Sequence, residues 1–147
     1  MGMFTSFDIN ASGMTAQRFR MDIISENVAN ANTTRTSDGS PYVRKVVTFT
    51  EKDTQTPFHH VLNKATDRYS GKGVKIDGVY EDTKTEMNMV YDPSHPDADE
   101  NGYVTYPNVN IITEMTNLID ASRSYEANAT AFNASKTLAM QGLNLGK

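Results

Sequence analysis

Two stretches of the chain, residues 5–32 and 108–143, place apolar side chains at helical spacing along one face. In the first stretch these side chains recur every seven residues, with one further position inside the last repeat: Phe7, Met14, Met21, Val28 and Ile24. Heptad spacing is typical of helices that pair as a coiled coil. The pattern therefore predicts an N-terminal helix about 40 Å long.

The second stretch continues the same repeat over a longer distance: Ile111, Leu118, Tyr125, Phe132 and Ala139. The intervening positions of its stripe are Met115, Ser122, Ala129 and Lys136. Asn108 follows Pro107 and is predicted to cap this helix, and Gly142 and Gly146 are candidate stops. The predicted helix is about 54 Å long, which is unusual for a small globular domain.

The middle of the chain, residues 35–107, has a different character. β-branched and aromatic residues predict strands at 42–49, 74–80 and 87–91. In the second of these, the apolar and polar alternation runs up to Asp77-Gly78, which is a turn signal. The polar stretch from about 51 to 73 predicts a mobile loop. Residues 92–102 contain two prolines and several acidic residues, and they predict a second loop that ends in a tight turn at Asn101-Gly102.

These elements predict an α+β fold, in which long N- and C-terminal helices pair as a coiled-coil-like hairpin around a small β-rich middle region. Residues 1–34 and 108–147 form the predicted helical assembly domain, and residues 35–107 form the middle region. Both helices carry apolar residues off the shared seam, for which the chain offers no obvious partner. The pattern therefore favours association with other chains, although such a stripe is also found in an ordinary core.

Composition narrows the classes of function. The 147 residues carry a net charge of -4 without a basic block, which argues against nucleic-acid binding because no cationic face is present to neutralise phosphates. The chain contains no cysteine, which excludes disulfides and thiolate chemistry. No apolar run reaches the roughly 20 residues of a membrane span, so we expect no direct membrane insertion. The N-terminus also lacks the pattern of a secretory signal peptide.

The acidic loop is the most suggestive candidate for chemistry. Asp97-x-Asp99-x-Asn101-Gly102 matches the start of an EF-hand calcium loop, but the twelfth position is Asn108 instead of glutamate. His95 lies among these acids, yet no second set of zinc ligands or catalytic partners accompanies it. We therefore expect no catalytic residues, no bound metal and no cofactor. A calcium-binding coiled-coil module is the alternative from a different class.

Several segments resemble a known family. Residues 12–22 and 25–33, Ser-Gly-Met-Thr-Ala-Gln-Arg-Phe-Arg-Met-Asp and Ser-Glu-Asn-Val-Ala-Asn-Ala-Asn-Thr, resemble the N-terminal signature of the flagellar rod and hook proteins. Residues 90–104 and 107–110 are similar to the FlgC class of proximal-rod proteins, as are 121–128 and 143–146. Another axial subunit, FlgB-like or from the distal rod, is the alternative within the same family.

The resemblance implies a non-enzymatic subunit of the bacterial flagellar basal body, located in the periplasmic zone outside the cytoplasmic membrane. Such a subunit is carried by the flagellar type III export apparatus and polymerises with copies of itself and other rod proteins into a torque-transmitting shaft. Asparagines at the end of the first helix have amides that either hydrogen-bond across subunits or end the helix. The predicted assembly interface consists of Phe7, Met14, Met21, Ile24, Asn27, Val28, Asn30, Asn32, Ile111, Met115, Leu118, Tyr125 and Phe132.

Overall fold

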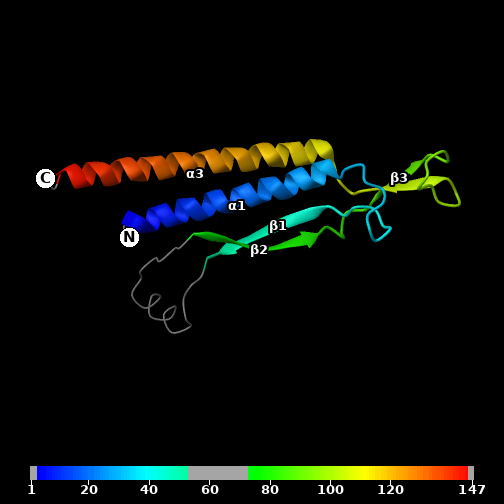
Figure 1. Ribbon diagram of the computed structural model, residues 1–147, viewed down its shortest axis with the longest axis horizontal. Helices are drawn as coiled ribbons and strands as arrows, with labels where there is room; N and C mark the ends of the chain where they lie inside the picture. The colour runs from blue at the N-terminus through cyan, green and yellow to red at the C-terminus, as the bar shows by residue number, and fades with distance from the viewer. Residues whose placement is uncertain (1–2, 53–72, 146–147) are drawn as a thin grey trace, which may run out of the picture. The chain divides into compact units, whose positions relative to one another are not determined.

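The computed structural model describes residues 3–52 and 73–145 and confirms the predicted α+β fold, with two long helices and antiparallel strands between them (Figure 1). The predicted loop at about 51–73 falls largely outside these residues. The elements in chain order are α1 Met3–Ala29, β1 Lys45–Glu51, β2 Val74–Glu81, β3 Asn88–Tyr91, β4 Tyr103–Tyr106 and α3 Ile111–Leu145.

The chain divides into two compact units, and both helices contribute to each. Unit 1 comprises Met1–Phe19, Phe49–Asp77 and Ser122–Lys147, and unit 2 comprises Arg20–Thr48 and Gly78–Ala121. This division does not follow the predicted one, which separated the terminal helices from residues 35–107. That residues 1–34 and 108–147 act as one domain during polymerisation therefore stays a prediction.

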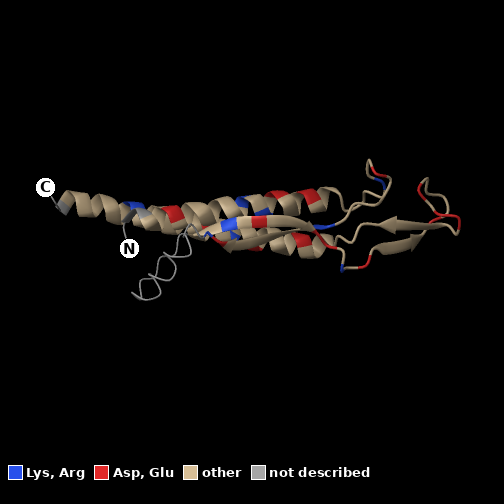
Figure 2. Cartoon of the chain, turned by 90° about the horizontal axis from the view of Figure 1, so that it is seen from below, with Lys and Arg blue, Asp and Glu red and all other residues tan. Residues whose placement is uncertain are grey.

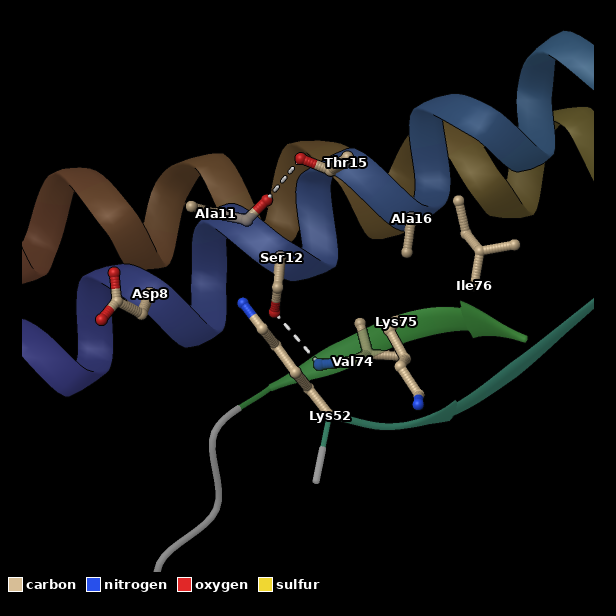
Figure 3. Close-up of a pocket in the computed structure, with 9 residues that line it drawn as sticks. All are labelled: Asp8, Ala11, Ser12, Thr15, Ala16, Lys52, Val74, Lys75 and Ile76. Carbon is tan, nitrogen blue, oxygen red and sulfur yellow. Dashed lines mark hydrogen bonds between the residues drawn. The ribbon is translucent and has the colours of Figure 1, made fainter. Parts of the chain in front are cut away.

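In unit 1 the first part of α1 lies between the last part of α3 and the ends of β1 and β2 (Figure 1). The ring of Phe7 meets the ring of Phe132 edge to face, with 5.0 Å between the ring centroids. On the other side of α1, the Val74 amide donates to Ser12 Oγ over 3.1 Å (Figure 3). Helix α1 is therefore covered on two sides.

A solvent-open cavity of about 410 Å³ lies where α1 faces the strands in unit 1 (Figure 3). Its lining residues are Asp8, Ala11, Ser12, Thr15, Ala16, Lys52, Val74, Lys75 and Ile76. Gly73 directly precedes β2 with a φ of 98°, and a Cβ at that position would overlap Ser12 Oγ. Only glycine allows the chain to enter β2 this close to α1.

In unit 2 the last part of α1 again has α3 on one side and the strands on the other (Figure 1). Asn27 of α1 hydrogen-bonds to Glu114 of α3 and to the backbone of Lys45 in β1. The apolar core is small, and its most buried members are Ile24, Ala31, Tyr42, Val104, Val109 and Ala121. A core of this size leaves much of the packing to polar side chains, which are described in the next subsection.

Strands β1 and β2 form one two-stranded sheet, and β3 and β4 form another. The Asp82 amide donates to the Arg44 carbonyl, and the Lys52 amide donates to the Gly73 carbonyl, so β1 and β2 run antiparallel. The turn predicted at Asp77-Gly78 is wrong, because β2 continues to Glu81. A Cβ at Gly78 would lie 3.0 Å from the Tyr80 ring, so this glycine makes room for an aromatic side chain within the strand.

Strand β4 was not predicted from the sequence, where Asn101-Gly102 marked only the end of a loop. It pairs antiparallel with β3 from Asn88 opposite Tyr106 to Tyr91 opposite Tyr103. Gly102 has a φ of 80°, and its position just before β4 agrees with the predicted tight turn. With four residues, β4 is too short for its alternation to stand out from the neighbouring loop.

The C-terminal helix differs from its predicted bounds at both ends. Asn110, and not Asn108, is the cap: its Oδ1 accepts the Thr113 amide over 3.2 Å and its carbonyl accepts the Glu114 amide. Gly142 does not stop the helix, which continues to Leu145. Gly146 lies outside the described residues.

The two helices of unit 1 approach closely at Gly13. A Cβ at this position would lie 2.9 Å from Oδ1 of Asn128, whose Nδ2 donates to the Ser124 carbonyl over 2.8 Å. The amide of Asn128 is therefore held in place by its own helix while its other end lies against the glycine. Gly142 differs, because a Cβ there would meet nothing within 4 Å.

We expect Gly13→Ala to destabilise the chain or leave it unimproved, because the clash with Asn128 offsets the gain of about 1 kcal/mol in helix propensity. Gly142→Ala is the matched control, and it should keep most of that gain. Urea denaturation followed by circular dichroism measures both. A full gain in stability at Gly13 would show that the helices are not in close contact there.

Candidate assembly site

A buried carboxylate lies at the centre of unit 2. Glu114, in the first turn of α3, is 1% exposed. Its Oε1 accepts hydrogen bonds from Arg44 Nη2 at 2.7 Å and Arg44 Nε at 2.9 Å. Its Oε2 accepts Asn27 Nδ2 at 3.1 Å. The charge of Glu114 is therefore compensated by the guanidinium that precedes β1 and by an amide of α1.

Asn27 of α1 uses its full hydrogen-bonding capacity inside the chain. Its Nδ2 donates to Glu114 Oε2 and to the Lys45 carbonyl, and its Oδ1 accepts the Lys45 amide and the Tyr42 hydroxyl, both at 2.9 Å. An amide has two donor hydrogens and two acceptor lone pairs, so all four are used. Asn27 was predicted to be an assembly residue, and here its amide has no bond left to offer a neighbouring subunit.

Asn108, which was predicted to cap the helix, joins three backbone segments instead. Its Oδ1 accepts the Arg44 amide over 2.9 Å, and its Nδ2 donates to the carbonyls of Asp82 and Thr85. The Arg44 side chain also reaches Asp82 Oδ2 over 3.2 Å. Glu114, Asn27, Arg44, Asp82, Tyr42 and Asn108 are called the polar cluster below.

The pKa shifts in the polar cluster follow from these contacts. Burial by itself lowers the pKa of Arg44, but the hydrogen bonds and charges of Glu114 and Asp82 outweigh it, so the pKa is raised. Hydrogen bonds from Thr85, followed by weaker ones that include the Arg44 bond, hold the pKa of Asp82 below its ordinary value. Burial, assisted by nearby carboxylates, raises the pKa of Tyr42 to about 12.

This arrangement fixes the geometry of the elements that it joins. Each buried polar group of the polar cluster has a hydrogen-bond partner. Removing one partner destabilises the fold, whereas replacing the whole set with apolar side chains can be neutral. The bonds connect α1, β1 and α3 at single positions. The polar cluster therefore sets the register of these three elements, which heptad packing alone leaves degenerate.

The predicted interface residues fall into three groups. Ile24 and Asn27 are buried, and Phe7, Met14, Met21, Val28, Leu118, Tyr125 and Phe132 are partly covered by the chain itself. Asn30 donates to the Glu26 carbonyl and accepts from the Thr33 hydroxyl, so it ends α1, whereas Asn32 is exposed. Ile111 and Met115 are 42% and 55% exposed.

The stripe of α3 that faces the rest of the chain is shifted from the predicted one. Leu118, Tyr125 and Phe132 lie on it as expected, and Ser122 and Ala129 are partly covered as well. Met115 and Lys136 are exposed, and the covered face extends to Glu114, Ala121, Asn128 and Ser135, each one residue earlier than an expected intervening position. Ile111 and Met115 are exposed in the single chain, so their place in the assembly interface stays a prediction. The sequence pattern missed Glu114 and Asn128 because they are polar residues with partners inside the chain, which a hydropathy pattern reads as exposed.

The acidic loop is built as a turn. Asp99 Oδ1 accepts the amides of Asn101 and Tyr103 at 2.9 and 2.8 Å, and Asp97 accepts the Thr34 hydroxyl and lies 3.7 Å from Arg35. The carboxylates that resembled the start of a calcium loop therefore have partners inside the chain: backbone amides for Asp99, and the Thr34 hydroxyl and Arg35 for Asp97. Over the described ranges, no three His, Asp or Glu residues gather as a metal site would require. In the same ranges, neither α1 nor α3 is suited in length and apolar character to cross a membrane.

Comparison with known proteins places similarity along the whole chain. Residues 7–35 match the family described as flagella basal body rod protein, and residues 100–145 match the C-terminal region of the flagellar basal body rod FlgEFG proteins. The flagellar basal-body rod protein FlgC of Bacillus subtilis is 43% identical, and the alignment covers all of both chains. FlgC of Borreliella burgdorferi is 42% identical over 94% of this chain and 93% of its own. FlgC of Salmonella typhimurium is 37% identical over the full length of both.

We expect Glu114→Ala to lower the free energy of unfolding by about 3–5 kcal/mol, because it leaves the Arg44 guanidinium without its main partner. Glu126→Ala, an exposed position of the same helix, should change it by less than about 0.5 kcal/mol. Urea titration measures both. If Glu114→Ala changed the free energy of unfolding as little as Glu126→Ala, the polar cluster would contribute little to stability.

The raised pKa of Tyr42 predicts a loss of stability at alkaline pH. The folded chain holds the phenolic proton more tightly than the unfolded chain, so its contribution is complete below pH 10 and is lost as the pH rises through about 12. Tyr42→Phe should cost about 1 kcal/mol at neutral pH and show a shallower decline between pH 10 and 12. Parallel pH profiles of the two proteins would contradict this assignment.

Proposed function

Since this chain belongs to the FlgC family of flagellar basal-body rod proteins, we propose that the outer faces of its two long helices hold it in that rod. As a member of this family it is a structural subunit of the basal-body rod. The observation that carries the proposal is an exposed apolar stripe at the start of α3. It consists of Ile111, Ile112, Met115 and Ile119, which are 42%, 78%, 55% and 53% exposed.

The stripe follows helical spacing. Ile111, Met115 and Ile119 are four residues apart, and Ile112 lies beside them, so the four side chains form one continuous strip over the first turns of α3. Scattered exposed apolar residues are ordinary, but a contiguous strip marks a contact surface. Because the rest of unit 2 leaves these side chains uncovered, we assign them to contacts with other subunits.

The remainder of α3 is poor in charge. The 35-residue helix holds Glu114 in the polar cluster and only four other charged residues, namely Asp120, Arg123, Glu126 and Lys136. Figure 2 shows long uncharged stretches along it. Solvated helices usually carry charged residues on the face opposite their core. A helix with so few of them is suited to being covered by neighbouring helices, and Leu138 and Leu143, each 69% exposed, extend this character into unit 1.

Several hydroxyl groups on the exposed helix surfaces donate hydrogen bonds to backbone carbonyls of their own helix. The hydroxyls of Thr116 and Thr137 donate to the carbonyls of Ile112 and Asn133, and on α1 the exposed Thr15 and Ser25 donate to Ala11 and Met21. A hydroxyl that already has an acceptor costs little to remove from water. Long stretches of these helix surfaces therefore carry no charge, and the hydroxyls named here already have hydrogen-bond acceptors.

The proposed mechanism separates two sets of residues. Phe7, Met14, Met21, Ile24, Val28, Leu118, Tyr125 and Phe132 hold the chain's own helices together, and the polar cluster fixes their register. Ile111, Met115 and the exposed Asn32, together with Ile112 and Ile119, face other rod proteins and further copies of this chain. Assembly by such contacts involves no catalytic step, so we propose that the chain has no enzymatic activity.

Two parts of the functional hypothesis stay predictions from the family resemblance and the composition. One is delivery by the flagellar type III export apparatus. The other is the lack of nucleic-acid binding, for which the net charge of -4 is the support.

We expect Ile112→Asp to reduce incorporation into the rod at least about tenfold, because a carboxylate in a closed apolar contact is not compensated. The measurement is immunoblotting of basal bodies purified from a flagellated host that lacks its own copy, together with swimming on soft agar.

Thr113→Asp is the matched control. It adds the same charge in the same turn but lies one heptad before Asp120, on a face that already carries a carboxylate, and an acidic residue is favourable near a helix N-terminus. Circular dichroism of both purified variants should match the parent chain. Normal incorporation of Ile112→Asp, or equal loss with both variants, would contradict the proposed interface.

A further inference from the structure

The hairpin formed by β3 and β4 leaves one backbone edge open. The Asp92 amide donates to the Gly102 carbonyl over 2.9 Å, so residues 88, 90 and 92 are the ones that bond across to β4. In an antiparallel pair the alternate residues direct their backbone groups away from the partner strand. The amides and carbonyls of Met89 and Tyr91 therefore point outward from β3.

The two outer edges of this hairpin differ. On the β4 side, the Tyr103 amide donates to Asp99 Oδ1 and the Tyr103 carbonyl accepts the Asp99 amide, each over 2.8 Å, so the preceding turn closes that edge. On the β3 side, no residue in the described ranges bonds to the outward groups of Met89 or Tyr91. The β3 edge is the open one.

The strand carries no lysine or proline that would block this edge. Natural proteins block exposed strand edges with lysine, proline, bulges or a covering segment. Asn88–Tyr91 contains no lysine or proline, and Met89 and Tyr91 are each 64% exposed. The rings of Tyr91 and Tyr103 meet edge to face with 5.3 Å between centroids, which adds an aromatic surface beside the open backbone. A two-stranded hairpin is also marginal in isolation, so a third strand would stabilise it.

The charge of the hairpin restricts what can pair with it. Residues 86–106 contain five carboxylates and no lysine or arginine. They are Glu86, Asp92, Asp97, Asp99 and Glu100. Figure 2 shows acidic residues gathered at the hairpin loop. Glu86 and Asp92 lie just before and after the open edge, and Ser94 lowers the pKa of Asp92, which keeps it ionised. Pairing of two identical hairpins along β3 would bring like charges together.

We propose that the outer edge of β3 is a strand-addition site for an extended segment of a different protein chain. That segment has apolar or β-branched residues at alternate positions and a Lys or Arg at each end, about six residues apart, to face Glu86 and Asp92. Main-chain hydrogen bonds to Met89 and Tyr91 supply the attachment, and the flanking carboxylates select the partner. This site is separate from the helix faces proposed above and does not depend on them.

The test uses the isotope-labelled full chain and the synthetic peptide Lys-Val-Thr-Val-Thr-Val-Lys, blocked at both ends. Added peptide should slow hydrogen exchange of the Met89 and Tyr91 amides and leave the Val90 amide nearly unchanged, because Val90 already bonds to β4. The same peptide with glutamate at both ends should bind at least about tenfold more weakly. Met89→Pro removes only an outward donor, so it should abolish binding while the Val104 amide stays protected.

Each of three results would overturn the proposal. The first is no response at millimolar peptide. The second is equal binding of the glutamate-flanked peptide. The third is protection of Met89 and Tyr91 in the chain alone at high concentration, which would identify a second copy as the occupant. None of these depends on incorporation into the rod, so the helix-face proposal stands or falls separately.

Discussion

The ion pair between Glu114 and Arg44 is the constraint on which unit 2 depends. The apolar core there is small, so the packing of helix on strand cannot be specified by shape alone. The carboxylate places the start of α3 against the residue that precedes β1, and Asn27 adds α1 through the same carboxylate. Because a buried charge tolerates few alternative positions, one well-partnered group fixes three elements at once.

The exposed surfaces and the interior differ in the kind of side chain that they hold. Inside unit 2, the side chains of the polar cluster are partnered, and on the surface of α3, apolar side chains are exposed without a partner in the described part of the chain. This inversion is expected when the chain belongs to a larger structure, because the surface seen in one subunit is the interior of the assembly.

The long elements could be predicted from the sequence because their periodicity extends over many turns. Helix α1 and most of α3 appear within a few residues of their predicted bounds, and Phe7 does meet Phe132. The errors lie where polar residues occupy buried positions. Asn108 resembled a cap because it follows a proline, and Glu114 resembled a surface residue, although both are satisfied by groups far away in the chain. Such partners have no local signature, since they belong to segments separated by 64 and 70 residues.

The same long-range bonds determine when unit 2 can fold. Asn27 and Glu114 are 87 residues apart, and Arg44 and Glu114 are 70 apart, so closing the polar cluster requires a large loss of chain entropy before any contact repays it. While the chain is being synthesised, Asn27 and Arg44 emerge long before their partner. The interior of unit 2 therefore cannot close prematurely, and the late arrival of a single carboxylate times the folding of the N-terminal half.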